Sequence, residues 1–172
     1  DVLWLPTGEM RLFYFEGNFV GSAGPMEDAH PFYAATSSDG VHFEVDGLAL
    51  EVEEATDPSV VQLNDGTWLM AISQGSQTLF AASTQGLEYQ LTGAAVEGGV
   101  PELALLDDGS LRCFVTANGI ESHLSSDNGA TWTKESGTRL SGPTGQVTAD
   151  PSLIKLSDGT FELYYKTMEP ME

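Results

Sequence analysis

Residues 125–133 read SSDNGATWT, and this loop decides the fold. Ser125 and Asp127 offer side-chain oxygens to the backbone N–H groups of a tight turn, and Gly129 supplies the unusual backbone dihedral angle. Trp132 follows the glycine by three residues, and its ring is suited to fill the gap beside a hairpin. The stretch therefore predicts a mainly structural turn between two β-strands.

Two shorter relatives of this loop occur earlier in the chain, as TSSDGVHF and ASTQGLEY. They align with it on Gly40 and Gly86. In all three loops a serine stands three residues before the glycine and an aromatic residue three residues after it: Ser37, Ser83 and Ser126, then Phe43, Tyr89 and Trp132. Such recurrence indicates a repeated structural unit.

A second set of turns lies between these loops. Each joins two short apolar runs, in the segments VLWLPTGEMRLFYF, SVVQLNDGTWLMAI, ELALLDDGSLRCFV and SLIKLSDGTFELYY. Their turn glycines are Gly8, Gly66, Gly109 and Gly159, and an apolar residue follows two residues after each. Two apolar runs around a Gly-containing turn are typical of a β-hairpin.

The glycine spacings indicate units of four strands. Gly66 to Gly86 and Gly109 to Gly129 each span 20 residues, whereas Gly8 to Gly40 spans 32, so the first unit carries 12 extra residues. We predict an all-β fold, a β-propeller of four-stranded antiparallel blades. The expected blades are 1–50, which lacks its start, then 51–96, 97–142 and a half blade, 143–172. A β-sandwich is the competing architecture, but it would not need this recurrence.

About three and a half blades cannot close a ring, because closed propellers have roughly four to eight. Either the chain is a fragment, or self-association or a further chain completes the propeller.

Twenty-six acidic residues oppose six basic ones, which gives a net charge of −20. This charge repels phosphate, so nucleic acid and anionic membranes are poor partners. The apolar runs are too short to span a bilayer. The charge is typical of a soluble, salt-adapted or extracellular surface, and we expect an extracellular or periplasmic protein. Cys113 is the single cysteine, and its alternating apolar surroundings place it in the core.

The pattern S-x-D-x-G-x-T-W of residues 125–132 resembles the Asp-box of sialidases and related propellers. The runs ATDPSVVQLNDGTWLM and TADPSLIKLSDGTFELYY resemble inner strands of five-bladed glycoside hydrolases, including arabinanase- and fructosidase-like enzymes. The resemblance implies a propeller that acts on or binds carbohydrate. It is less specific for activity than for fold, because propellers without catalysis also carry Asp-boxes.

A sialidase active site is not supported. Sialidases hold the substrate carboxylate with three arginines, the first in a Phe/Tyr-Arg-Ile-Pro segment that this chain lacks. Its three arginines are Arg11, Arg112 and Arg139, and the first two share one repeat position, which favours a structural role.

Glycoside hydrolysis needs two carboxyl groups beside one bond. The resemblance to five-bladed hydrolases implies acids that project from the innermost strands into a central funnel, often before a proline. Asp57 and Asp150 match, because each precedes a proline and stands nine residues before its turn glycine. Both also fit a structural alternative, an aspartate that caps a loop entering a strand. The third unit has Val100 at this position, and Glu102, two residues later, is a weaker catalytic candidate.

The extra residues of the first unit include GSAGPMEDAHPFY, with Glu27, Asp28 and His30. Loops longer than a repeat requires tend to carry function, so these three are predicted substrate-binding residues, with a solvated loop as the alternative. Acids and a histidine also suit acid–base chemistry or a metal, but their spacing matches no metal motif, and no cofactor motif is present. His42 and His123 have no assigned role.

The leading hypothesis is part of a secreted propeller glycoside hydrolase, with carbohydrate as its partner. The alternative is a non-catalytic propeller that binds glycan or protein or serves in assembly. Exposed aromatic rings would favour sugar binding, yet repeat position places Trp68 and Trp132 in the core.

Overall fold

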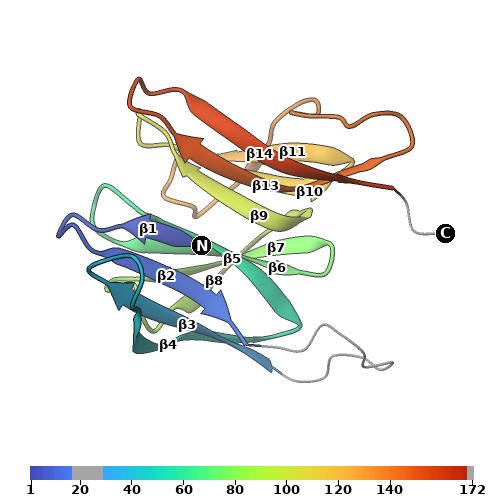
Figure 1. Ribbon diagram of the computed structural model, residues 1–172. Helices are drawn as coiled ribbons and strands as arrows, with labels where there is room; N and C mark the ends of the chain where they lie inside the picture. Colours follow the sequence, from blue (N-terminus) through green and yellow to red (C-terminus); the bar gives the residue numbers. More distant parts are fainter. Residues whose placement is uncertain (17–28, 170–172) are drawn as a thin grey trace.

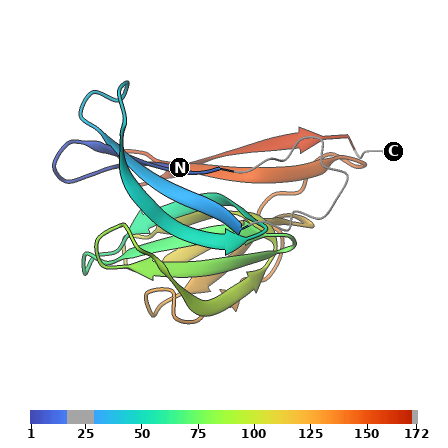
Figure 2. The same ribbon diagram turned by 90° about the horizontal axis from the view of Figure 1, so that it is seen from below.

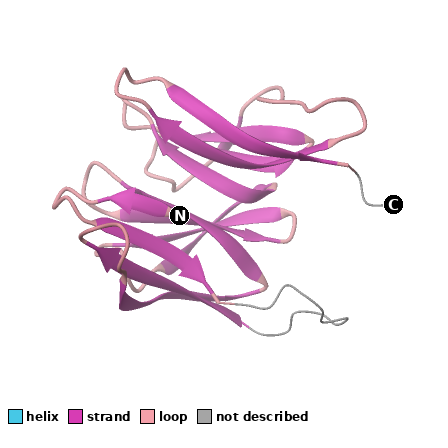
Figure 3. Cartoon of the chain, in the orientation of Figure 1, coloured by secondary structure: helices cyan, strands magenta, loops and turns pink. Residues whose placement is uncertain are grey.

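The structure is a computed structural model that describes residues 1–16 and 29–169. Within these residues all regular structure is β, in four separate antiparallel sheets (Figures 1 and 3). The all-β prediction is confirmed. No helix in the described part of the chain is long and apolar enough to cross a membrane.

Each sheet contains strands that follow one another in the sequence. Sheet 1 has β1 (Val2–Trp4), β2 (Met10–Phe15), β3 (Ala29–Ser37) and β4 (Glu44–Glu53). Sheet 2 has β5 (Ala55–Gln62), β6 (Trp68–Gln74), β7 (Gln77–Ser83) and β8 (Gln90–Glu97). Sheet 3 has β9 (Gly99–Leu105), β10 (Leu111–Ala117), β11 (Gly119–Ser125) and β12 (Thr133–Lys134). Sheet 4 has β13 (Val147–Lys155) and β14 (Phe161–Met168).

The sheets pack face to face in chain order, with sheets 2 and 3 between sheets 1 and 4 (Figure 1), and Figure 2 shows the same array from below. The first strands β5, β9 and β13 each contact the preceding sheet. This serial packing of sequence-consecutive sheets differs from a β-sandwich, in which two sheets share one core. Sheet 1 has four strands, although β1 has only three residues.

Two apolar cores lie between the sheets. Sheets 1 and 2 enclose Phe13, Phe32, Trp68, Met70 and Ile72. Sheets 2 and 3 enclose Leu69, Ala71, Phe80, Leu111, Cys113 and Val115. Alternate residues of β6 belong to different cores because side chains on a strand alternate between faces. Each large buried side chain contributes about 1.5–3 kcal/mol. Cys113 is fully buried, and burial raises the pKa of its thiol, which confirms a core residue.

The turn that joins β11 to β12 has the expected hydrogen bonds. Ser125 Oγ accepts the Gly129 N–H at 2.9 Å, and Asp127 Oδ1 accepts the Thr131 N–H at 2.9 Å. Thr131 Oγ1 donates to Asp127 Oδ2 at 2.6 Å, and these bonds lower the Asp127 pKa to about 2. The ring of Trp132 stacks on Phe80 of sheet 2, with centroids 4.4 Å apart and planes at 13°. The tryptophan therefore fills space between two sheets.

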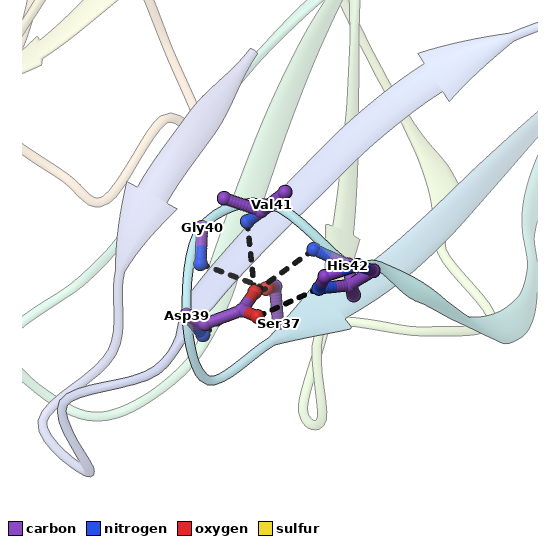
Figure 4. Close-up of polar contacts among 5 residues, drawn as sticks. All are labelled: Ser37, Asp39, Gly40, Val41 and His42. Atoms are coloured by element: carbon purple, nitrogen blue, oxygen red, sulfur yellow. Dashed lines mark hydrogen bonds and ion pairs between the residues drawn. The ribbon is translucent and has the colours of Figure 1, made fainter.

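The shortened turn that joins β3 to β4 forms in the same way (Figure 4). Ser37 Oγ accepts the Gly40 N–H at 2.9 Å, and Asp39 Oδ1 accepts the N–H groups of Val41 and His42 at 2.8 Å each. His42 Nδ1 adds a contact of 2.7 Å to Asp39 Oδ2. The hydrogen bond from this imidazole, followed by the backbone bonds, holds the Asp39 pKa below its usual range.

Candidate functional site

The first strands of sheets 2, 3 and 4 share a bulge at one repeat position, nine residues before the turn glycine. Asp57, Val100 and Asp150 occupy it with φ values of 50°, 47° and 55°, in the left-handed region. The pairing register of each strand shifts at this point. Bulges redirect side chains and are frequent beside active sites, and left-handed backbone is strained for a residue other than glycine. The three residues therefore form one repeated feature.

A cavity of about 450 Å³ opens between these first strands and β2. Its walls come from all four sheets: Asp1, Leu12, Phe13, Tyr14, Phe15, Asp57, Pro58, Pro101, Glu102, Pro151 and Ser152. We call it the inner-strand cavity. It brings together two of the three predicted catalytic acids, Asp57 and Glu102. Asp150 does not line it, although the next two residues do.

Glu102 is held by two neighbouring sheets. Ser59 Oγ of β5 donates to its Oε2 at 3.1 Å, and the Leu153 N–H of β13 donates to its Oε1 at 2.8 Å. Burial raises the pKa of Glu102, and these hydrogen bonds offset only part of that rise. A carboxyl group that keeps its proton to higher pH is suited to act as a general acid.

The contact from Glu102 to Leu153 belongs to a repeated series. Seven residues before the turn glycine, a side-chain oxygen accepts a backbone N–H of the next sheet's first strand. Asp1 Oδ2 accepts from Val60 at 2.7 Å, and Ser59 Oγ accepts from Leu103 at 2.9 Å. Glu102 thus joins sheets as well as lining the cavity.

The two predicted aspartates have different surroundings. Asp57 is exposed, and its Oδ2 accepts the hydroxyl of Thr56 at 2.7 Å. Asp150 is half-buried and forms an ion pair with Lys166 of β14. The ion pair occupies the Asp150 carboxylate, whereas Asp57 forms no ion pair with the described residues, so Asp57 is the more accessible of the two.

Of the three predicted substrate-binding residues, the structure describes only His30. Glu27 and Asp28 lie outside the described residues. His30 belongs to β3 instead of the preceding loop, because β3 pairs with β4 from Ala29 onward. Its side chain is buried, with Nδ1 2.7 Å from the Ala55 carbonyl oxygen and the ring stacked on Phe15. His30 does not line the inner-strand cavity, and a direct role in substrate binding stays a prediction.

The other two histidines lie away from the inner-strand cavity. His42 belongs to the turn of Figure 4. His123 is buried, with Nε2 3.2 Å from the Glu97 carbonyl oxygen, and burial lowers its pKa. Within residues 1–16 and 29–169, no group of three or more histidine, cysteine or acidic side chains is arranged to hold a metal ion.

The arginines have structural contacts, as their repeat position predicted. Arg11 donates to the Gln85 carbonyl at 3.2 Å and lies over the Trp68 ring. Arg112 binds both carboxylate oxygens of Glu135, at 2.8 and 3.0 Å. Neither lines the inner-strand cavity.

Sequence reasoning missed several contributors to the site, among them Asp1, which lines the cavity and accepts a backbone N–H of β5. Tyr14 and Phe15 form an aromatic wall of the cavity, and Lys166 neutralises Asp150. Phe15 and Lys166 share one repeat position, which is a serine in sheet 2 and a threonine in sheet 3, so the repeat pattern gave no signal for either.

No protein-family model and no curated protein matches the chain. Solved structures share its fold. One is a protein of unknown function from Dyadobacter fermentans, with a TM-score of 0.69 and 17% identity over 98% of this chain. An α-L-arabinofuranosidase from Clostridium thermocellum has a TM-score of 0.59 and 14% identity over 98% of this chain, and 67% of that chain is covered. An endo-arabinanase from Bacillus licheniformis has a TM-score of 0.60 and 15% identity, with 97% and 71% covered.

The last two belong to family 43 of the glycoside hydrolases, which are five-bladed β-propellers. The chain therefore has the fold of a partial β-propeller, which confirms the predicted architecture. It spans 61% of the length of the Dyadobacter protein. Identities this low establish a shared fold and not a shared activity.

Proposed function

We propose that the chain is part of a propeller that hydrolyses glycosidic bonds in the inner-strand cavity. The observation that carries the proposal is the pair of unlike carboxyl groups in one cavity, a buried Glu102 with a raised pKa and an exposed Asp57. The Asp-box-type turns support a place among the sialidase-like propellers, without a sialidase activity.

The two acids have complementary roles in this proposal. Glu102 donates its proton to the leaving-group oxygen, because burial favours its neutral form. Asp57 acts as the base or the nucleophile, with Thr56 orienting one of its oxygens. Asp150 contributes negative charge that Lys166 compensates beside the cavity.

The substrate class that fits is a neutral saccharide. The chain has a net charge of −20, and none of its arginines lines the cavity, so an anionic sugar would find no partner there. Tyr14 and Phe15 offer apolar ring surface for the C–H face of a sugar. The fold neighbours that act on arabinose-containing substrates make these the first saccharides to test. We also propose an extracellular or periplasmic location, which such a substrate and the acidic composition support.

We propose further that other sheets of the same repeat cover the two ends of the array. Phe161 of sheet 4 is 38% exposed, whereas its equivalents Trp68 and Leu111 are 5% and 0% exposed inside the array. Sheet 1 likewise exposes Trp4 (70%) and Leu48 (47%). The molar mass of the purified protein, measured by light scattering, shows whether a second copy of the chain supplies these sheets. Activity is then measured on the assembled protein.

The test is hydrolysis of neutral arabinose- and xylose-containing oligosaccharides by the assembled protein and its variants. Asp57→Asn and Glu102→Gln are each expected to lower kcat by about 100-fold or more, the usual contribution of a general acid or base. Glu51→Gln is the control, because Glu51 is an exposed acid of β4 outside the cavity. The proposal fails if either cavity variant hydrolyses these sugars as fast as the control.

A second candidate is a propeller that binds saccharides without cleaving them. The observation in its favour is the loss of acids at the bulge position, where Val100 replaces one aspartate and Lys166 pairs with another. Saccharide binding by calorimetry, unchanged in Glu102→Gln and unaccompanied by product release, would favour this candidate.

A further inference from the structure

The backbone N–H of each left-handed bulge residue needs a hydrogen-bond acceptor. In two of the three bulges the acceptor is the same kind of group, a side-chain hydroxyl. The Val100 N–H donates to Ser73 Oγ at 3.0 Å, and the Asp150 N–H donates to Thr116 Oγ1 at 3.0 Å. Ser73 and Thr116 both stand seven residues after the turn glycine of the preceding sheet. A hydroxyl group at this position thus fixes the bulge of the next sheet.

Sheet 1 has Phe15 at the equivalent position, which has no hydroxyl group to accept the Asp57 N–H. The backbone leading to Asp57 is held from β3 instead. His30 Nδ1 is 2.7 Å from the carbonyl oxygen of Ala55, two residues before Asp57. Because a carbonyl oxygen only accepts, this ring nitrogen carries the proton. The side chains of His30 and Ala55 are 5% and 0% exposed, so water does not compete.

We call this contact, from a side chain to the backbone carbonyl two residues before the bulge residue, a clamp. The next unit has a matching clamp, which shows that the contact belongs to the repeat. Thr78 Oγ1 of β7 donates to the Gly98 carbonyl oxygen at 2.8 Å. Ala55 and Gly98 both stand eleven residues before their turn glycines, and both bonds come from the third strand of the preceding sheet. The bulge of sheet 3 has both this clamp and the bond from the bulge residue's N–H to a serine hydroxyl. The bulge of sheet 2 has the His30 clamp, and Phe15 packs against the histidine ring.

Phe15 connects the clamp to the cavity. Its ring stacks on His30 with centroids 5.9 Å apart and planes at 18°, and Phe15 lines the inner-strand cavity, as Asp57 does. Gln74 holds the Glu53 carbonyl at 2.8 Å, farther from Asp57 and before the left-handed Glu54. Of these two side-chain contacts with the backbone before the bulge, that of His30 is the nearer to Asp57.

We propose that His30 is a positioning residue that fixes the strained bulge and so aims Asp57 into the inner-strand cavity. The catalytic consequence rests on the proposed function, but the positioning itself does not. His30 thereby acts through the backbone, from a buried place in β3, rather than as a ligand of the sugar.

The test separates the donor from the ring. His30→Phe keeps a flat ring against Phe15 but removes the donor, whereas His30→Asn keeps a donor near the place of Nδ1. Thr78→Val is the matched control, because it removes the equivalent clamp beside Val100. The first readout is the NMR backbone and carboxyl signals of Asp57. They are expected to move in His30→Phe, to return toward the wild-type values in His30→Asn and to stay in place in Thr78→Val.

The second readout is hydrolysis of the best saccharide substrate. His30→Phe is expected to lower kcat by about 100-fold with KM within about twofold, because small displacements of a catalytic group have this effect. His30→Asn should recover much of the loss. Unmoved Asp57 signals in a folded His30→Phe protein overturn the proposal. If the signals move while Asp57→Asn hydrolyses normally, the positioning stands and the proposed function falls.

One measurement needs no variant. Nitrogen NMR of the wild-type protein reports which ring nitrogen of neutral His30 carries the proton. The proposal requires Nδ1–H, and a ring protonated on Nε2 alone contradicts it even if His30→Phe fails to fold.

Discussion

The turns at residues 37–43 and 125–132 have nearly the same internal hydrogen bonds and quite different surroundings. In both, a serine hydroxyl accepts the glycine N–H and an aspartate accepts backbone N–H groups. The second turn packs on sheet 2, through Trp132 on Phe80, whereas the first leaves Val41 73% exposed at the end of the array. Hydrogen bonds within the segment are therefore sufficient to form the turn. Only a turn beside a neighbouring sheet also contributes to the packing between sheets.

The largest difference between the two turns should appear when their aromatic residues are removed. Trp132→Ala is expected to lower the free energy of unfolding by about 3 kcal/mol, because the partly buried ring leaves a gap against Phe80. Phe43→Ala, at the end of the array, should cost about 1 kcal/mol or less. Urea unfolding measures both, and equal losses would show that the sheet interface adds nothing to the turn.

A smaller difference is expected at the turn glycines. Gly129 and Gly66 have φ values of 84° and 85°, so alanine should cost about 1–2 kcal/mol at either from backbone strain alone. At Gly129 the added Cβ would also lie 2.7 Å from Leu69 Cδ2, whereas at Gly66 it meets no atom within 4 Å. Gly129→Ala should therefore unfold at a lower urea concentration than Gly66→Ala. The reverse order would mean that the turn does not pack on sheet 2 as described.

The smallest effect concerns acid stability. The Asp127 pKa is lowered to about 2 in the folded protein, mainly by the Thr131 hydroxyl and N–H, so the unfolded chain binds this proton at higher pH. The resulting stabilisation is present above the ordinary aspartate pKa and is lost as the pH falls toward about 2. Asp127→Asn should flatten the decline of the unfolding midpoint between pH 5 and pH 2, roughly the window of this titration. If the unfolding midpoint of Asp127→Asn falls with pH in parallel with that of the wild type, Asp127 does not contribute to the acid sensitivity.

The sequence predicted best what depends on neighbours in the chain. The spacing of Gly66 and Gly86, the turn around Asp127 and the burial of Cys113 all follow from local turn chemistry and strand alternation. These features repeat because each sheet is made from consecutive strands. The unit with the clearest sequence pattern therefore made it possible to predict the strands of the others.

The candidate site depended on contacts between strands and between sheets, which spacing alone does not give. Glu102 was the weakest of the predicted acids because it stands two residues from the position of Asp57. The bulge at the Asp57 position breaks the regular alternation of side chains, so the sequence spacing did not show that both acids line one cavity. The ion pair of Asp150 with Lys166 joins β13 to β14 away from the turn that connects these strands, and the local sequence of neither residue predicts it.

The most direct test of the central claim is the dependence of hydrolysis on the leaving group, compared between the wild type and Glu102→Gln. A proton donor matters most when the leaving group is a sugar alcohol and least when it departs as a stable nitrophenolate. We predict that Glu102→Gln loses about 100-fold or more in kcat on oligosaccharides but retains most of its rate on nitrophenyl glycosides. Equal losses on both kinds of substrate, or none on either, would contradict the assignment of Glu102 as the acid of this cavity.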